Sequence, residues 1–415
     1  MNLILHTIMV NRYLPAFFFC FFLSYSHAQE VTYEQHIAPI IQKNCVSCHR
    51  SGGYGPFPLT TYADVQKRGK FIAHVTKTKY MPPWKADPSF SHFKNERILT
   101  DLEIDQIQLW VAQGMKRGEV SSQSPVDSHS VSFTKPDLVL SMNSTFQLST
   151  KGIEDYRFFH VPTHLDRDVY VSAIGFMAGN KRYVHHSRIM VDTSGQTSGI
   201  DGLSEFDPRS LAFQNKPLMD EFLYGWVPGN IPVAYPSGTA KLIPKGADLI
   251  FNIHYAPSSE SATDLSEVHL YFSDVPVKHL IKSLSIREED IANQPFVIRS
   301  ETSPTFYVSK VLEEDMNVVS LLPHMHFLGK SMTALAILPD QTQVPLISIP
   351  EWDYNWQSTY MFESPVFLPK GTLLLMTATF DNTSNNPLNP TIPPKDVTYG
   401  WNSTDEMMNL VMYYY

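Results

Sequence analysis

The sequence predicts a multidomain protein in which a small all-α module precedes two antiparallel, jelly-roll-like β-sandwich domains. Three observations lead to this prediction. A chain of 415 residues is too long for one ordinary domain. Apolar side chains recur at helical spacing between residues 30 and 117. From residue 136 onward, short runs of Val, Ile, Phe, Tyr and Leu are broken by Pro, Gly, Asn and Asp, as in antiparallel sandwiches.

These patterns divide the chain into five segments. Residues 1–28 precede the helical module at 30–117, and a Ser-rich linker of low apolar periodicity covers 118–135. The first predicted sandwich covers residues 136–288, and the second covers 289–415. The composition, 43% hydrophobic and 18% charged, is typical of soluble globular proteins. The formal net charge of -9 argues against a nucleic-acid partner.

The first 28 residues have the pattern of a secretory signal. Arg12 precedes an apolar run from Leu14 to Leu23 that is too short to span a bilayer, and Ser26 and Ala28 offer small residues at a cleavage site. The alternative is an uncleaved N-terminal anchor. The pattern favours export to the periplasm or out of the cell, with cleavage near Ala28 and no stable membrane insertion.

The cysteines indicate a cofactor rather than a disulfide framework. Of three cysteines, Cys20 would leave with the signal, and Cys45 and Cys48 would remain. With His49 they form C-x-x-C-H, the signature for c-type haem, in which two thioether bonds hold the porphyrin and the histidine binds iron. The alternatives are a redox dithiol and half of a zinc site. A dithiol does not need the histidine, and no second cysteine pair completes a zinc site.

The helical module offers two candidates for a second axial iron ligand. Met81 lies in Tyr80-Met81-Pro82-Pro83-Trp84, where two prolines prevent a helix and favour an extended loop across a haem face. His74 lies on an amphipathic helix expected at about residues 62–79. Thioether ligation would raise the reduction potential, and we therefore favour Met81.

Capping sequences mark where the helices of this module begin. Thr32-x-x-Gln35 and Thr100-x-x-Glu103 resemble capping boxes, and the last helix should end at Gly114. Residues 30–117 as a whole resemble a class I cytochrome c domain. The haem-binding positions of that family are matched by Cys45, Cys48, His49 and Met81.

Histidines in the second part of the chain suggest copper. His324 and His326 would project from the same side of a β-strand, because successive side chains alternate between its faces. His185, His186, His254 and Met407 lie in other strand-like stretches. Imidazole binds both oxidation states of copper, and thioether sulfur favours Cu(I). The adjacent pair His185-His186 can bind one ion only at a bulge or a strand end.

Four stretches in this part resemble the copper type II, ascorbate-dependent monooxygenases, the family of peptidylglycine α-hydroxylating monooxygenase and dopamine β-monooxygenase. They are Val184-His185-His186, Asn252-Ile253-His254-Tyr255, His324-Met325-His326-Phe327-Leu328-Gly329-Lys330 and Asp405-Glu406-Met407-Met408-Asn409-Leu410, in the order of the family. The resemblance implies that an electron-accepting copper is held by His185, His186 and His254. It implies that a catalytic, oxygen-binding copper is held by His324, His326 and Met407.

The sequence also departs from that family. Leu322 and Val411 stand where the peptide-hydroxylating enzymes have an Arg and a Tyr that anchor the substrate's carboxylate, although Asn409 is retained. A glycine-extended peptide is therefore not the expected substrate. The disulfides of the family are absent, so the sandwiches must be stable through packing alone.

The combined expectation is an exported copper-dependent monooxygenase that hydroxylates a C–H bond of an organic substrate with O2. Its electrons would come through the haem from an external donor, which would replace or supplement ascorbate. The substrate would be a small molecule or peptide-like. The alternatives are a non-catalytic copper-binding protein, an electron carrier on the same scaffold, and an enzyme that oxidises without inserting oxygen.

Overall fold

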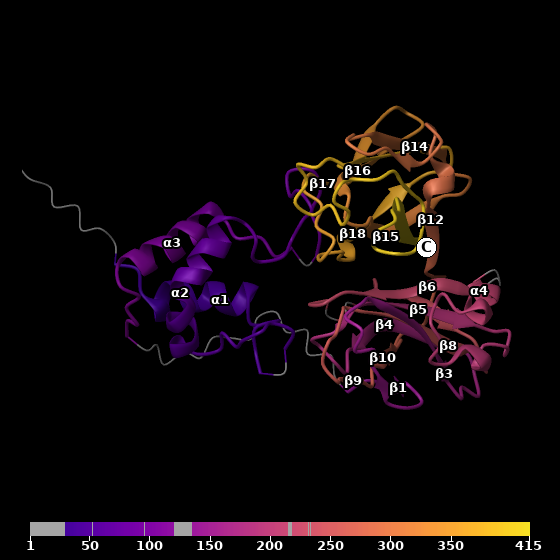
Figure 1. The fold of residues 1–415 in the computed structure, drawn as a ribbon, viewed down its shortest axis with the longest axis horizontal. Coiled ribbons are helices and arrows are strands. Elements are labelled where there is room, and N and C mark those ends of the chain that lie inside the picture. The colour runs from indigo at the N-terminus through magenta and orange to yellow at the C-terminus, as the bar shows by residue number, and fades with distance from the viewer. Residues whose placement is uncertain are drawn as a thin grey trace, which may run out of the picture.

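A computed structural model describes residues 30–51, 53–94, 96–119, 135–214, 218–230, 232 and 234–415. The predicted signal and linker residues 120–134 lie outside this range. Strands dominate the described chain, and they form two groups of sheets beside a set of helices (Figure 1). None of the described helices is long and apolar enough to cross a membrane.

The first sandwich follows directly on the linker. Its larger sheet consists, in spatial order, of β1 (Leu138–Ser141), β10 (Glu267–Phe272), β4 (Val169–Met177), β7 (Thr239–Ile243) and β11 (His279–Leu280). Its second sheet consists of β3 (Asp155–Pro162), β8 (Asp248–Tyr255), β5 (Val184–Asp192) and β6 (Asp220–Trp226), and a short ribbon pairs β2 (Phe146–Gln147) with β9 (Thr263–Asp264). Phe176, Trp226 and Phe251 from the two sheets meet in the core between them.

Strand β8 is buried along almost its whole length, and three consecutive residues, Leu249, Ile250 and Phe251, are apolar. Ile250 faces a small second cluster with Phe213 of α4 (Pro208–Gln214) and Ile200 of the 3-10 turn Ser198–Ile200. The outer face of β8 is therefore covered by a helix and a turn, and a strand covered on both faces loses the usual contrast between apolar and polar positions. Its last residues, which include His254, are consequently buried.

The second sandwich contains the C-terminus. One sheet consists of β12 (Lys282–Ile286), β21 (Asn409–Tyr414), β15 (Met316–His324) and β18 (Tyr360–Leu368). The other consists of β14 (Thr305–Val311), β19 (Leu373–Phe380), β16 (Gly329–Ile337) and β17 (Gln343–Ile349), and a ribbon pairs β13 (Val297–Ile298) with β20 (Val397–Thr398). Leu321, Met332 and Met412 are fully buried between the sheets. Packing of this kind replaces the absent disulfides.

The N-terminal helices are a π-turn (Tyr33–Ile37), α1 (Ala38–Asn44), α2 (Tyr62–Lys77) and α3 (Asp101–Ala112). Reciprocal capping boxes begin α2 at Thr61 and Asp64, and α3 at Thr100 and Glu103 as predicted. The expected cap at Thr32 is wrong, because its side chain makes no capping hydrogen bond and its amide donates to the His36 ring.

The predicted fold class is wrong in its helical part. The described chain is mostly β-strand of β-sandwich type, only 14% is helical, and no small all-α cytochrome c domain is evident. A physical reason lies between α2 and α3, where residues 82–94 leave the helices and pack on the second sandwich (Figure 1). The amides of Asp87 and Lys94 donate to the carbonyls of Ser348 and Met361 at 2.8 and 2.7 Å.

Aromatic side chains hold this segment in place. Phe93 is buried in the core of the second sandwich, with its ring centroid 5.2 Å from those of Tyr360 and Phe362. The Trp84 ring lies 5.0 Å from that of Tyr360. Trp84, the last residue of the stretch that was expected to cross a haem face, therefore packs against a β-sandwich core.

Candidate metal centre

Three histidines converge at the edge of the first sandwich that faces the second. His186 on β5 lies directly opposite His254 on β8, and the register shifts between Val184 and His186. The shift makes His185 the extra residue of a β-bulge, so both neighbouring rings turn to the same side. The condition set by the sequence for this pair, a bulge or a strand end, is thus met.

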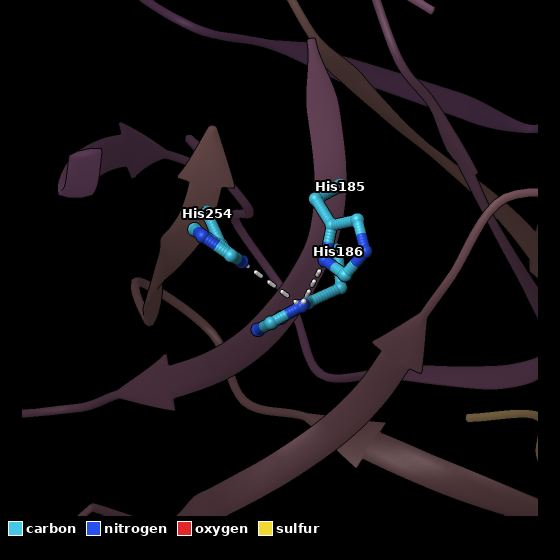
Figure 2. A group of neighbouring side chains, drawn as sticks. All are labelled: His185, His186 and His254. Atoms are coloured by element: carbon cyan, nitrogen blue, oxygen red, sulfur yellow. Dashed lines mark hydrogen bonds between the residues drawn. The ribbon is translucent and has the colours of Figure 1, made fainter. Parts of the chain in front are cut away.

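The ligand atoms of this three-histidine cluster lie close together. The Nδ1 atoms of His185 and His254 lie 3.2 and 3.3 Å from the Nδ1 atom of His186 (Figure 2). Possible ligand nitrogens of all three lie within 4.8 Å of one another. Three imidazole nitrogens that point at one position form a donor set suited to copper.

Burial lowers the pKa values of His185 and His186. Desolvation, followed by the charge of His254, lowers the pKa of His185 to about 4. Desolvation and the neighbouring histidines lower the pKa of His186 well below its usual value. Neutral imidazoles offer the lone pairs that a metal ion needs, so His185 and His186 can bind a cation at neutral pH.

The second group, His324, His326 and Met407, lines a cavity of about 170 Å³ together with His186. His324 is the last residue of β15, but His326 lies in the loop before β16, so the expectation that both stand on one strand is wrong. The loop is shaped by the buried carboxylate of Glu406, which accepts the amides of His326 and Leu328 at 2.9 and 2.6 Å. The centroids of the two imidazole rings still lie 5.0 Å apart.

Hydrogen bonds orient both rings of this group. Nδ1 of His324 contacts the side-chain oxygen of Gln357, and Nδ1 of His326 lies 3.0 Å from the Asp405 carbonyl. A nitrogen that donates to an oxygen carries the proton, so Nε2 keeps the lone pair for a metal. Burial lowers the pKa of His324 to about 3 and that of His326 to about 4.

The two groups face each other across the cavity. The ring centroids of His186 and His324 lie 6.5 Å apart. The Tyr354 ring stacks on His185 at 5.2 Å and lies 6.0 Å from the His326 ring. Tyr354 therefore contacts both groups, and no sequence motif marks it.

Other cavity-lining residues are the groups that a bound substrate would contact. Leu322 and Val411, where the peptide-hydroxylating enzymes have polar anchors, line the cavity beside Asn409. From the first sandwich, the Arg188 guanidinium reaches the wall and lies 5.2 Å above the Trp401 ring. Glu205, Glu221, Arg287 and Glu288 also line the cavity, which therefore combines apolar side chains with charged and polar groups.

The side chains that surround His254 are likewise not marked by any sequence motif. The Tyr156 ring stacks on the His254 ring at 4.1 Å with an angle of 3° between planes. Burial raises the pKa of Glu154, but its contacts with His254, Ser403 and Tyr156 outweigh burial and hold that pKa at about 2. Glu154 is therefore a carboxylate at neutral pH. An acidic residue just before a strand is too common a pattern to single out.

The residues predicted to hold haem are only partly brought together. Cys45 and Cys48 are free thiols, and burial raises the pKa of Cys45 to about 12. Nδ1 of His49 lies 3.0 Å from the Phe57 carbonyl, which leaves Nε2 available as a ligand. Met81 follows α2, where its amide donates to the Val75 carbonyl at 3.0 Å. No contact in the described chain joins Met81 to His49, and its role as an axial ligand stays a prediction.

The loop that carries these cysteines lies against the first sandwich. The Tyr54 ring lies 5.3 Å from the Trp226 ring of β6. Gly229, at a φ of +87°, approaches Cys48 so closely that a Cβ atom there would lie 3.2 Å from its sulfur. The C-x-x-C-H loop and the three-histidine cluster therefore share a neighbour, because Trp226 is the strand partner of Ser187, next to His186.

Comparisons with known proteins bear on the second sandwich. Residues 290–415 match the family model "Copper type II ascorbate-dependent monooxygenase, C-terminal domain". Among curated proteins, no match was found. Similar solved structures include an allantoicase, at 9% identity over 57% of this chain and 81% of that chain, with a TM-score of 0.17. Another is a structure of the Gt strain of infectious bursal disease virus, at 11% identity over 68% of this chain and 77% of that chain, with a TM-score of 0.16.

Structural similarities this weak carry no argument about function. The family match covers His324, His326 and Met407, which are among the residues that line the cavity from the second sandwich. It supports assignment of this part of the chain to the copper type II monooxygenase family.

Proposed function

We propose that the protein is an exported, copper-dependent monooxygenase that hydroxylates a C–H bond of a small organic substrate with O2. The observation that carries the proposal is the cavity that His186 of the first sandwich shares with His324, His326 and Met407 of the second. Bound copper ions would supply one-electron redox chemistry and O2 activation. The convergent imidazole nitrogens fit such ions.

The residues of the chain have separate tasks in this proposal. His185, His186 and His254 would hold the copper that stores electrons, and His324, His326 and Met407 the copper at which oxygen reacts. Gln357 and the Asp405 carbonyl fix the orientation of the second pair of rings. The apolar side chains of Leu322, Val411 and Phe222 exclude water and hold the substrate's C–H bond near the second group.

We further propose that electrons enter through a haem bound covalently at Cys45 and Cys48, with His49 and Met81 as iron ligands. The docking of this loop on the first sandwich supports the proposal. The Tyr54 ring contacts Trp226, and the strand partner of Trp226, Ser187, adjoins His186. Electrons could then reach the three-histidine cluster within one chain. Export to the periplasm, where c-type haem is attached in bacteria, is part of the same proposal.

Metal and haem content of the purified protein tests these proposals first. We expect two coppers by elemental analysis and one c-type haem by a pyridine haemochrome spectrum. Ascorbate-driven O2 uptake should then depend on copper. His324→Ala should abolish that uptake and lower the copper content by one, whereas His279→Ala, an exposed histidine of β11, should change neither. A chain that takes up no copper would overturn the copper proposal, and one without haem would overturn the electron route.

A further inference from the structure

Glu154, just before β3, makes contacts with both sandwiches. Its Oε1 atom lies 3.6 Å from Nε2 of His254. Its Oε2 atom accepts hydrogen bonds from the Tyr156 hydroxyl, at 3.3 Å, and from the Ser403 hydroxyl. One carboxylate thus meets a ligand of the first metal group, the ring stacked on that ligand, and a loop of the second sandwich.

The contact with His254 concerns the nitrogen that does not face the cluster. Nδ1 of His254 points toward His186, whereas Nε2 is buried and has no hydrogen-bond partner within ordinary range among the described residues. When Nδ1 binds a metal, the neutral ring must carry its proton on Nε2. A shift of a few tenths of an ångström would bring that N–H into hydrogen-bonding distance of Glu154.

The contact with Ser403 reaches the second metal group. Ser403 is buried in the loop between β20 and β21, two residues before Asp405, whose carbonyl contacts Nδ1 of His326. From His254 to His326, the connection therefore passes through Glu154, Ser403 and the short segment to Asp405. Each step is a direct contact or a covalent bond, and the connection spans the boundary between the sandwiches.

We propose that Glu154 is a positioning residue that holds His254 in its Nδ1-binding tautomer and ties the three-histidine cluster to the second sandwich. This inference rests on the proposed copper function. The carboxylate makes the imidazole a stronger donor to copper, as acidic partners of metal-bound histidines do. The hydrogen bond from Ser403 to Glu154 forms only when the two sandwiches are in contact. Formation of the first site therefore depends on the second sandwich.

Copper affinity at each site, measured by competition with a chromophoric chelator, tests the proposal on the full chain. A His324→Ala background isolates the first site, and a His254→Ala background isolates the second. Glu154→Ala should weaken copper binding at the first site roughly 10–100-fold and leave the second unchanged. Glu154→Gln should recover most of the affinity, because its amide oxygen can still accept the Nε2–H of His254. Ser403→Ala should weaken the first site less than Glu154→Ala does.

Two further readouts separate positioning from a general structural role. The Cu(II) electron paramagnetic resonance spectrum of the first site should change in Glu154→Ala, while thermal unfolding of the metal-free protein should change little. Glu260→Gln provides a matched control, since Glu260 lies on the same sandwich in an exposed ion pair with Arg182.

Three results would count against these assignments. Unchanged affinity and spectrum in Glu154→Ala would overturn the role of Glu154 alone. Equal weakening of both sites together with earlier unfolding would also overturn it, in favour of a structural role. A wild-type chain that binds no copper would instead overturn the proposed function.

Discussion

At the scale of single residues, the bulge at His185 decides what the first metal group can be. On a regular strand, His185 and His186 would face opposite sides, and only one could join His254. The extra residue in β5 turns both rings toward His254, whose own place is fixed by its pairing with His186. The sequence predicted all three residues, but it could not show the bulge, because a bulge depends on the pairing of β5 with β8.

Replacement of Met407 tests its assignment as a ligand of the second copper. Met407→Ala should reduce ascorbate-driven O2 uptake by at least tenfold, because the second site loses one of its three ligands. The first copper should remain reducible, since none of its ligands changes. Copper reduction followed by electron paramagnetic resonance, beside an oxygen-electrode assay, checks both parts. Unchanged O2 uptake would contradict the assignment of Met407.

At the scale of elements, the segment at residues 82–94 shows that sequence patterns do not predict long-range contacts. The capping boxes of α3 and the strands around His254 could be predicted, because these signals are local. The burial of Phe93 against Tyr360 and Phe362 joins residues more than 260 positions apart, and no local pattern reports such a contact. For the same reason no local pattern predicted Glu154 and Tyr354, which contact the metal groups only through tertiary packing.

Phe93 provides the test for this element. Phe93→Ala should lower the free energy of unfolding of the second sandwich by about 3–5 kcal/mol, because it removes a buried ring from a packed core. Denaturant unfolding measures the change. Phe71→Ala is a matched control, since Phe71 on α2 is 54% exposed, and its replacement should have little effect. A loss below about 1 kcal/mol would show that the segment is not packed as described.

At the scale of the whole molecule, the contact of Tyr54 with Trp226 links the proposed entry of electrons to the site that stores them. Tyr54→Leu should slow the reoxidation of a reduced haem by Cu(II) several-fold, since it opens a gap between the loop and β6. Absorbance after rapid mixing with a reductant follows the haem. Tyr170→Leu, an exposed residue of β4, should leave the rate unchanged. Equal rates in wild type and Tyr54→Leu would indicate another path.

The N-terminal part of the chain therefore contacts both sandwiches, through Tyr54 on the first and Phe93 on the second. A hinge motion that separated the sandwiches would have to break one of these contacts, in addition to the bond between Glu154 and Ser403. The N-terminal part thus connects the two sandwiches on either side of the cavity. The positions of the cavity-lining residues of the two sandwiches would accordingly stay fixed relative to each other, so the proposed copper site would need no domain closure to assemble.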